Sequence, residues 1–483
     1  MTIADKQVAD DTVASAAVAA NLTMKDAAAA LRDGSLTSVA LTEAVVDKAT
    51  RLNGVLGAYV EIMRDAALEQ AAAADAAFAA GEDKGPLQGL PLAIKDIIAL
   101  QGVPNTGNSE TRPADAIEEA DAPVVARLRE AGAVFVGKST TSEFAIGLPD
   151  DEKRFPIPRN PWDIARTPAG SSSGTGVAVA AGLALGGLGT DTGGSVRGPA
   201  CVNGHTGLKV TFGRVPKSGV LPLGYSLDSV GPMARSAYDC AMLLEVMAGY
   251  DATDPYCATA PVESYTAALD GNVEGLRIGL PTEYFFDHEQ LDDEVRKAVL
   301  AGVQKLTDLG ATATEFVLPN AELGAIANQV ILFSEAFAYH RNTLVERWSD
   351  YGRFTRHQLA RGAVYHGGDL AQANRFRQQF AQDVAAAFAD YDVLITPSAP
   401  VPAQLTEGMH PSQRLTQPSY TGHWNLTGLP AIAVPAGFTE SGLPLSLQVV
   451  GKPFAEAQVL KVADALQRVT DHHLAAPPVD ALA

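Results

Sequence analysis

Apolar residues follow two spacings along this chain, and the two spacings predict alternating helices and strands. Apolar positions three or four residues apart, closed by glycine or by a polar cap, predict helices. Short unbroken apolar runs predict buried strands. The predicted helices cover residues 24–32, 38–52, 63–80, 122–131, 177–185, 236–247, 292–309, 321–347, 370–389 and 455–469. The predicted strands cover residues 91–94, 133–136, 392–396, 431–434 and 445–450.

The order of these elements predicts an α/β fold. Helices that alternate with buried strands are typical of a sheet with helices packed on it. Strand signals near both ends of the chain predict that C-terminal segments complete the same sheet. We therefore expect a single α/β/α domain over residues 22–483, with a large mixed β-sheet covered by helices on both faces. Residues 1–21 are rich in Ala and Asp and predict a loose N-terminal tail.

Composition and charge narrow the class of protein. Hydrophobic residues make up 47% of the chain and charged residues 19%, which is ordinary for a globular protein with a large core. The net charge of −20 disfavours non-specific binding to nucleic acid, because the phosphate backbone is also negative. The longest apolar run, residues 177–188, contains glycines and is shorter than the ~20 residues of a membrane helix. These features predict no membrane association.

The cysteines and the N-terminus predict the compartment. Cys201, Cys240 and Cys257 lack the spacing of metal ligands, so we expect no metal site from them, and such sparse cysteines are typical of the reducing cytoplasm. Each is interpreted as a small buried apolar residue. The first residues carry acids where a secretory signal needs basic residues. A cytoplasmic location is therefore predicted.

Two segments rich in glycine and hydroxyl residues could carry chemistry. The first is Gly170-Ser171-Ser172-Ser173-Gly174. As G-x-S-x-G it matches the nucleophile elbow of α/β-hydrolases, centred on Ser172. That motif needs a strand directly before the turn, and Pro168 disfavours one. A flexible linker is the other alternative, but the compact apolar helix predicted after it is not typical of a linker.

The second segment runs from Gly189 to Arg197 and places Ser195 after two glycines. A turn of this kind can direct successive backbone N–H groups at one developing oxyanion, which is a large stabilising contribution in acyl transfer. A plain glycine turn explains the same residues equally well. Elsewhere, Lys95 ends an apolar run, and burial there would lower the pKa of its amine, so that it could act as a base. A surface lysine with a buried stem is the alternative.

Taken together, these segments resemble the amidase signature family of serine hydrolases. The first Gly/Ser segment matches the signature, and so does the spacing of 24 residues between Ser171 and Ser195. Further matching segments are Gly132–Lys138, Ser142–Ala145, Arg159–Trp162, Gly207–Lys209, Gly213–Val215, Asn425–Ala431 and Gly442–Leu445, in family order. The resemblance covers about residues 24–469, with a signature core at about 85–240. Departures from the family pattern are Ala169, Ser173 and Thr175.

The resemblance implies a set of site residues. Ser195 would be the nucleophile, Ser171 the proton bridge after a cis Gly170–Ser171 bond, and Lys95 the base. No cofactor and no metal are implied. Asp191 and Arg197 are interpreted as braces of the turn. The residues implied at the oxyanion and the substrate are Thr192, Gly193, Gly194 and Ala145, with Ser195 contributing its own amide.

The function expected is hydrolysis of carbon–nitrogen bonds in small linear amides through an acyl-enzyme, with carbamates, hydrazides or esters of similar shape as further substrates. The aromatic residues Phe333, Phe337, Tyr339 and Trp424 suggest an apolar pocket, although they could equally belong to the core. The partners expected are a small-molecule amide or carbamate and, as an option, a second copy in a homodimer, with no nucleic acid and no membrane.

Two alternatives stay open from the sequence. One is an amidotransferase-type subunit of the same family. Such subunits clamp a primary-amide amino acid with charged residues, and residues 417–424 offer no acid for that role. The other is an esterase of the α/β-hydrolase type that uses Ser172 with a late histidine, drawn from His410, His423, His472 and His473.

Overall fold

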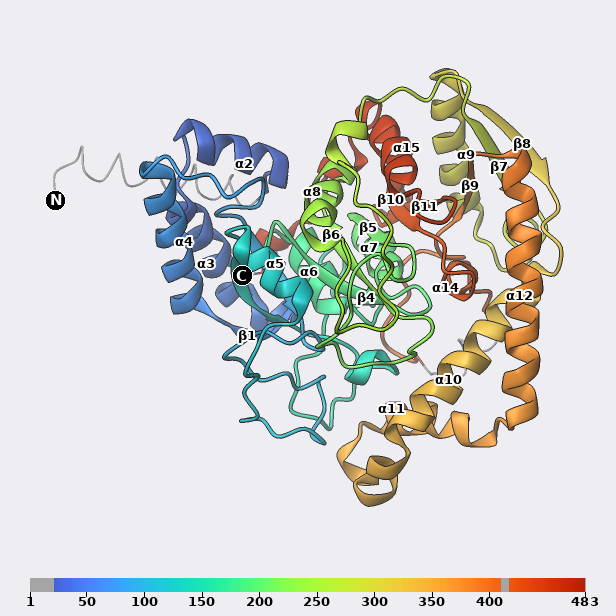
Figure 1. Ribbon diagram of the computed structural model, residues 1–483, viewed down its shortest axis with the longest axis horizontal. Helices are drawn as coiled ribbons and strands as arrows, with labels where there is room; N and C mark the ends of the chain where they lie inside the picture. The colour runs from blue at the N-terminus through green and yellow to red at the C-terminus, as the bar shows by residue number, and fades with distance from the viewer. Residues whose placement is uncertain (1–20, 410–416, 483) are drawn as a thin grey trace.

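The structure is a computed structural model, and it describes residues 21–409 and 417–482. The predicted tail, apart from Asn21, and His410 lie outside the described residues. In the described part of the chain, eleven strands form one mixed sheet (Figure 1). From edge to edge the sheet contains β1 (Tyr59–Ile62), β3 (Val134–Ser139), β2 (Pro91–Lys95), β4 (Gly186–Asp191), β6 (Ser229–Ala234), β5 (Thr206–Lys209), β10 (Ala431–Phe438), β11 (Pro444–Val450), β9 (Val393–Pro397), β7 (Arg277–Pro281) and β8 (Thr312–Phe316).

Helices cover this sheet and extend beyond it. The α-helices are α2 (Met24–Asp33), α3 (Ser38–Leu56), α4 (Arg64–Ala79), α5 (Pro123–Glu130), α6 (Ser173–Ala180), α7 (Arg197–Asn203), α8 (Ala237–Met247), α9 (Asp293–Asp308), α10 (Ala321–Glu346), α11 (Arg353–Ala360), α12 (Gly367–Asp390), α14 (Gly422–Leu426) and α15 (Glu456–Arg468). Short 3₁₀ helices are η1 (Glu143–Ala145), η2 (Thr266–Ala268), η3 (Trp348–Asp350), η4 (Arg361–Val364), η5 (His472–Leu474) and η6 (Val479–Leu482). The predicted α/β class with a large mixed sheet is confirmed.

The layers are visible in Figure 1. Helices α6 and α7 pack together on the sheet, and α8, α15 and α9 form a second packed group that also contacts it. Helices α2, α3 and α4 lie at one end of the molecule, and the long helices α10 and α12 lie at the other. Helix α10 contacts both α12 and the short helix α14. Helices α10 and α12 therefore form a helical wall beside the C-terminal half of the sheet. None of the helices in the described ranges is long and apolar enough to cross a membrane.

Strand β4 shows where the sequence prediction was wrong. The helix predicted over 177–185 lies at 173–180, and the glycine-rich residues that follow it form a central strand instead of only a turn. A Cβ on Gly186 or Gly189 would lie 2.6 Å from a methionine sulfur, and one on Gly187 would lie 2.5 Å from the Ala93 carbonyl oxygen. Glycine therefore permits this close packing, although it weakens the strand signal in the sequence.

The sheet places two strand ends side by side. Strands β2 and β4 are parallel neighbours, with Ile94 paired to Leu188. Parallel strands end at the same edge of a sheet. Lys95, the last residue of β2, therefore lies beside the end of β4 and the turn that follows it. Strands β1, β5, β6, β7 and β8 were missed by the sequence prediction.

Candidate active site

Lys95 lies at the centre of a buried cluster of hydroxyl groups. Its Nζ donates to Ser171 Oγ at 2.7 Å, Thr190 Oγ1 at 2.8 Å and Ser172 Oγ at 3.0 Å. An ammonium group has three N–H donors, so these three hydroxyls satisfy it completely. The side chain is fully buried. The prediction that this lysine is buried is confirmed.

The electrostatics of the cluster make a neutral lysine accessible near pH 7. Burial lowers the pKa of Lys95 to about 7, because the charged form loses its hydration, while the carboxylates of Asp191 and Asp228 act in the opposite direction. Burial also raises the pKa of Asp228 to about 6. A substantial share of Lys95 is therefore neutral near pH 7. A neutral amine keeps two donors and gains a lone pair, so that one neighbouring hydroxyl must donate to it.

Ser172 cannot be that donor without losing an existing bond. Its hydroxyl donates to the Thr190 carbonyl at 3.2 Å and accepts from the Thr190 amide at 3.2 Å as well as from Lys95. One donor and two acceptor sites are all that a serine hydroxyl has. Ser172 is also fully buried, and none of its partners is a histidine. The alternative in which Ser172 is an α/β-hydrolase nucleophile is therefore not supported.

Ser171 and Thr190 are the two hydroxyls that remain available to Lys95, and Ser171 is the one that belongs to the first Gly/Ser segment. The Gly170–Ser171 peptide bond is cis, as the resemblance implies. The Ser171 carbonyl accepts hydrogen bonds from the Ser142 amide at 3.1 Å and the Thr141 hydroxyl at 3.0 Å, which fixes the backbone. The Ser172 amide donates to the Ser195 carbonyl at 3.2 Å. This last bond joins the two Gly/Ser segments and sets Ser171 next to the Ser195 turn.

The turn after β4 is held by a buried ion pair. Asp191 accepts hydrogen bonds from the Gly194 amide at 2.7 Å and the Val196 amide at 3.1 Å. Arg197 donates to the same carboxylate through Nη2 at 2.9 Å and Nε at 3.0 Å. Burial alone would raise the pKa of Asp191, but the Arg197 guanidinium holds it well below its usual range. The interpretation of Asp191 and Arg197 as braces of the turn is confirmed.

The bracing decides which backbone amides of the turn are left without a partner. The Gly194 amide is committed to Asp191, whereas the amides of Thr192, Gly193 and Ser195 make no hydrogen bond within the described part of the chain. Gly194 has φ +127°, and a Cβ there would overlap Thr421 Oγ1. Three of the four expected amides are therefore free to bind an oxyanion, and the fourth anchors the turn.

Polar side chains outside the signature orient the carbonyls of this turn. Asn328 Nδ2 donates to the Thr192 carbonyl at 3.3 Å, and Thr421 Oγ1 donates to the Gly193 carbonyl at 2.7 Å. The Thr192 hydroxyl donates to Asp228 at 2.5 Å. These partners were missed in the sequence, because they come from α10, from the segment before α14 and from the loop before β6. No local motif signals such distant contacts.

A cavity of about 320 Å³ opens in front of this turn. Ser195 lines it, is partly exposed, and its hydroxyl makes no hydrogen bond within the described residues, including to Ser171. Ala145, which has φ +62°, lines the cavity as well. The structure thus brings the predicted residues together at one cavity: Gly193, Gly194, Thr192, Ala145 and Ser195 at its surface, and Lys95 and Ser171 behind them.

Helical segments supply another part of the cavity lining. Gln329 and Phe333 of α10, together with Gln358 and Arg361, line the same cavity as residues 417–421. Of the four aromatic residues considered in the sequence, Phe333 lines this cavity and Tyr339 lines a different one. Phe337 packs against the core, and Trp424 is core, stacked on Phe285.

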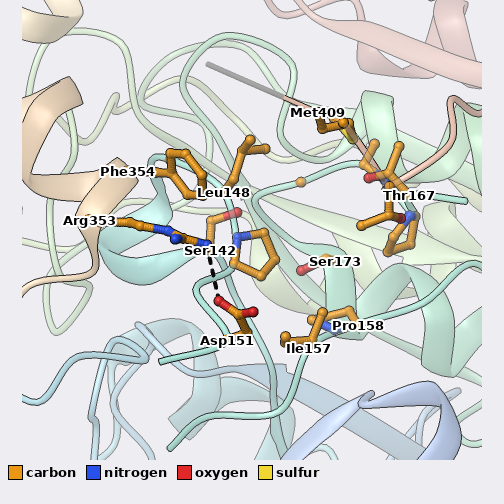
Figure 2. Close-up of a pocket in the computed structure, with 17 residues that line it drawn as sticks. Ser142, Leu148, Asp151, Ile157, Pro158, Thr167, Ser173, Arg353, Phe354 and Met409 are labelled. Carbon is orange, nitrogen blue, oxygen red and sulfur yellow. Dashed lines mark hydrogen bonds and ion pairs between the residues drawn. The ribbon is translucent and has the colours of Figure 1, made fainter. Parts of the chain in front are cut away.

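A second cavity of about 290 Å³ adjoins the first (Figure 2). The two share Gly147, Ala169 and Gly170. Figure 2 shows Arg353 on one side of it, ion-paired with Asp151 at 3.0 Å, and Ser173 on the other. This cavity does not include Ser195 in its lining.

Comparisons with known proteins agree with this geometry. The family model "Amidase" matches residues 40–460. A relative from Roseiflexus sp. (strain RS-1), named as one subunit of glutamyl-tRNA(Gln) amidotransferase, is 40% identical over 94% of this chain and 98% of its own. A solved structure of a vestigial protein complex that reveals the evolutionary origins of an s-triazine catabolic enzyme has TM-score 0.87 at 31% identity, covering 93% of this chain and 98% of its own. The native peptide amidase of Stenotrophomonas maltophilia has TM-score 0.82 at 30% identity, covering 94% and 98%.

These relatives correct one prediction. The expectation that the partners are a small-molecule amide or carbamate, with no nucleic acid and at most a second copy of the chain, is wrong because it leaves out other protein subunits. The full-length relative from Roseiflexus is named as part of an amidotransferase, and other relatives with the same name cover the chain as completely. Such names imply protein partners for relatives of this length. Net charge, on which only the exclusion of nucleic acid rested, carries no information about a specific protein interface.

A family model that spans most of the chain, near-complete relatives and a shared fold all point to the same family. The chain belongs to the amidase family, whose members include the amidase signature enzymes.

Proposed function

We propose that this chain is the amide-hydrolysing subunit of an amidotransferase-type complex, and that it acts through Lys95, Ser171 and Ser195. The observation that carries the proposal is the position of Lys95 Nζ 2.7 Å from Ser171 Oγ, while Ser172 has no free hydrogen-bonding capacity. The names of the full-length relatives support the role within a complex. The peptide amidase among the structural neighbours supports amide hydrolysis.

The relay moves protons and bonds as follows. Neutral Lys95 accepts the Ser171 proton, Ser171 accepts the Ser195 proton, and Ser195 Oγ forms a bond to the carbonyl carbon. The oxyanion is stabilised by the three amides that the turn leaves free. The proton then returns through Ser171 to the amide nitrogen, the carbon–nitrogen bond breaks, and ammonia or an amine leaves. Water next attacks the acyl-enzyme by the same route, which releases the acid and restores Ser195.

Substrate binding has to complete one contact in this scheme. The Ser171 and Ser195 hydroxyls are not hydrogen-bonded to each other in the described part of the chain. Catalytic hydrogen bonds in free enzymes are often long and tighten in the substrate complex. The carbonyl group in the cavity would draw the Ser195 side chain toward the amides and toward Ser171. Carbamates and esters of matching shape would react by the same steps.

The test is ammonia release from primary amides, measured for the purified chain and for the assembly isolated from its native host. Wild-type protein should release ammonia, and Ser195→Ala should lower kcat/KM by roughly 10⁴-fold or more, since members of such a relay act as a unit. The melting temperature should stay unchanged, because Ser195 Oγ has no partner to lose among the described residues. An inactive wild type would contradict hydrolysis, and a chain that is always isolated alone would contradict the role within a complex.

A further inference from the structure

Arg361 is the feature of the cavity that the proposed mechanism does not use. It begins η4, and its guanidinium lies over the ring of Phe333, 4.1 Å from the centroid. Its Nη1 donates to Gln358 Oε1 at 2.9 Å and its Nη2 donates to Gln329 Oε1 at 3.5 Å. All four residues line the same cavity as Ser195. The aromatic face and the two amide oxygens therefore hold the guanidinium in place without neutralising it.

The charge of Arg361 has no counter-charge in the described part of the chain. No carboxylate forms an ion pair with it there, and the described lining of the cavity contains no Asp or Glu. Arg353, on the preceding helix, is the opposite case, since Asp150, Asp151 and Glu152 lie 3.6, 3.0 and 3.9 Å from its nitrogens. Figure 2 shows its pair with Asp151. The unmatched cation is thus a property of the Ser195 cavity and not of the adjoining one.

The donors of Arg361 define the chemistry of a ligand. A guanidinium has five N–H donors in one plane, and Gln358 and Gln329 use two of them. A carboxylate matches such a planar pair of donors through both oxygens. An ammonium group on the ligand would find no carboxylate in the described lining.

We infer that Arg361 binds the carboxylate of an amide substrate that carries no ammonium group. The inference rests on the proposed function, because it places the scissile carbonyl at the turn of Ser195 and the carboxylate at Arg361. The substrate class is an anionic amide such as the monoamide of a dicarboxylic acid. A zwitterionic amino-acid amide fits less well, because its ammonium would face the same unmatched cation.

The experiment compares three primary amides of similar size, which are glutaric monoamide, L-glutamine and neutral pentanamide. Wild-type kcat/KM should be highest for glutaric monoamide. Arg361→Met should lower kcat/KM for that substrate by about 10- to 100-fold, the worth of hydrogen bonds to a charged group, and should change the value for pentanamide by less than about threefold. Arg361→Lys should recover part of the loss, since it keeps the charge without the planar donors. Arg353→Met is the matched control and should keep the wild-type ratio.

A binding measurement separates this inference from the proposed function. Calorimetric titration of glutaric monoamide into Ser195→Ala should show binding that Ser195→Ala/Arg361→Met loses. Binding that depends on Arg361 without turnover in the wild type would overturn hydrolysis and leave the carboxylate site standing. Three outcomes would overturn the inference and leave hydrolysis standing. They are an equal ratio of kcat/KM between the amides in wild type and Arg361→Met, a ratio that changes in Arg353→Met, and a preference for L-glutamine.

Discussion

The two sides of the Ser195 cavity differ in how fully their polar groups are bonded. On the side of the sheet, Lys95 has three hydroxyl partners, Ser172 has three bonds, and Asp191 is enclosed by backbone amides and Arg197. On the side of the helices, Arg361 has two neutral partners and N–H groups to spare. Fully bonded buried groups are held rigidly, whereas the spare N–H groups of Arg361 can bond to a ligand. We therefore propose that the sheet side of the cavity sets the reaction and that the helix side sets the identity of the substrate.

This division makes a general prediction. Substitutions on the sheet side should lower the turnover of every amide by the same factor. Substitutions on the helix side should change the ratio between amides.

The largest effect is expected from the base. Lys95→Ala should lower kcat/KM for all amides by roughly 10⁴-fold. Lys95→Arg should be nearly as inactive, because a guanidinium stays protonated. Wild-type kcat/KM should rise about tenfold per pH unit below pH 7 and level off above it, since the active form of Lys95 is neutral and its pKa is about 7. An active Arg variant, or a rate without this acid limb, would show that the base is another group.

The next effect distinguishes two neighbouring serines. Ser171→Ala should cost about 10²–10⁴-fold in kcat/KM, because the relay loses its bridge. Ser172→Ala is the matched control and should cost about tenfold, the value of one hydrogen bond to Lys95. Steady-state kinetics with two amides measures both. Equal losses would mean that Lys95 acts without a specific bridge. The double variant Ser171→Ala/Lys95→Ala should be little worse than either single one.

The smallest effect concerns the electrostatics behind the turn. The negative charge of Asp228 raises the pKa of Lys95. Asp228→Asn removes that charge while its side-chain oxygen can still accept from Thr192, so the pKa of Lys95 should fall. The acid limb of kcat/KM should then move to lower pH, with the ratio between amides unchanged. A limb that stays in place would show that Asp228 and Lys95 are not coupled.

The same division explains what the sequence could predict. Lys95, Ser171 and Ser195 lie in short segments that are visible in a few adjacent residues, and the resemblance to the amidase signature family assigns their roles. Arg361 and Gln329 meet only because η4 packs on α10. Asn328 and Thr421 likewise reach the turn from segments far along the chain. Strand β4 escaped prediction because its glycines serve close packing, and the alternation that marks a strand needs side chains.

The most direct measurement of the central claim is active-site labelling. Wild-type protein is treated with a fluorophosphonate, digested and analysed by mass spectrometry, with Lys95→Ala treated in parallel. We predict that the label lies on Ser195 in the wild type, and that labelling of Lys95→Ala is slower by orders of magnitude. A label on Ser172 or Ser171, or labelling of Ser195 at the same rate without Lys95, would contradict the account.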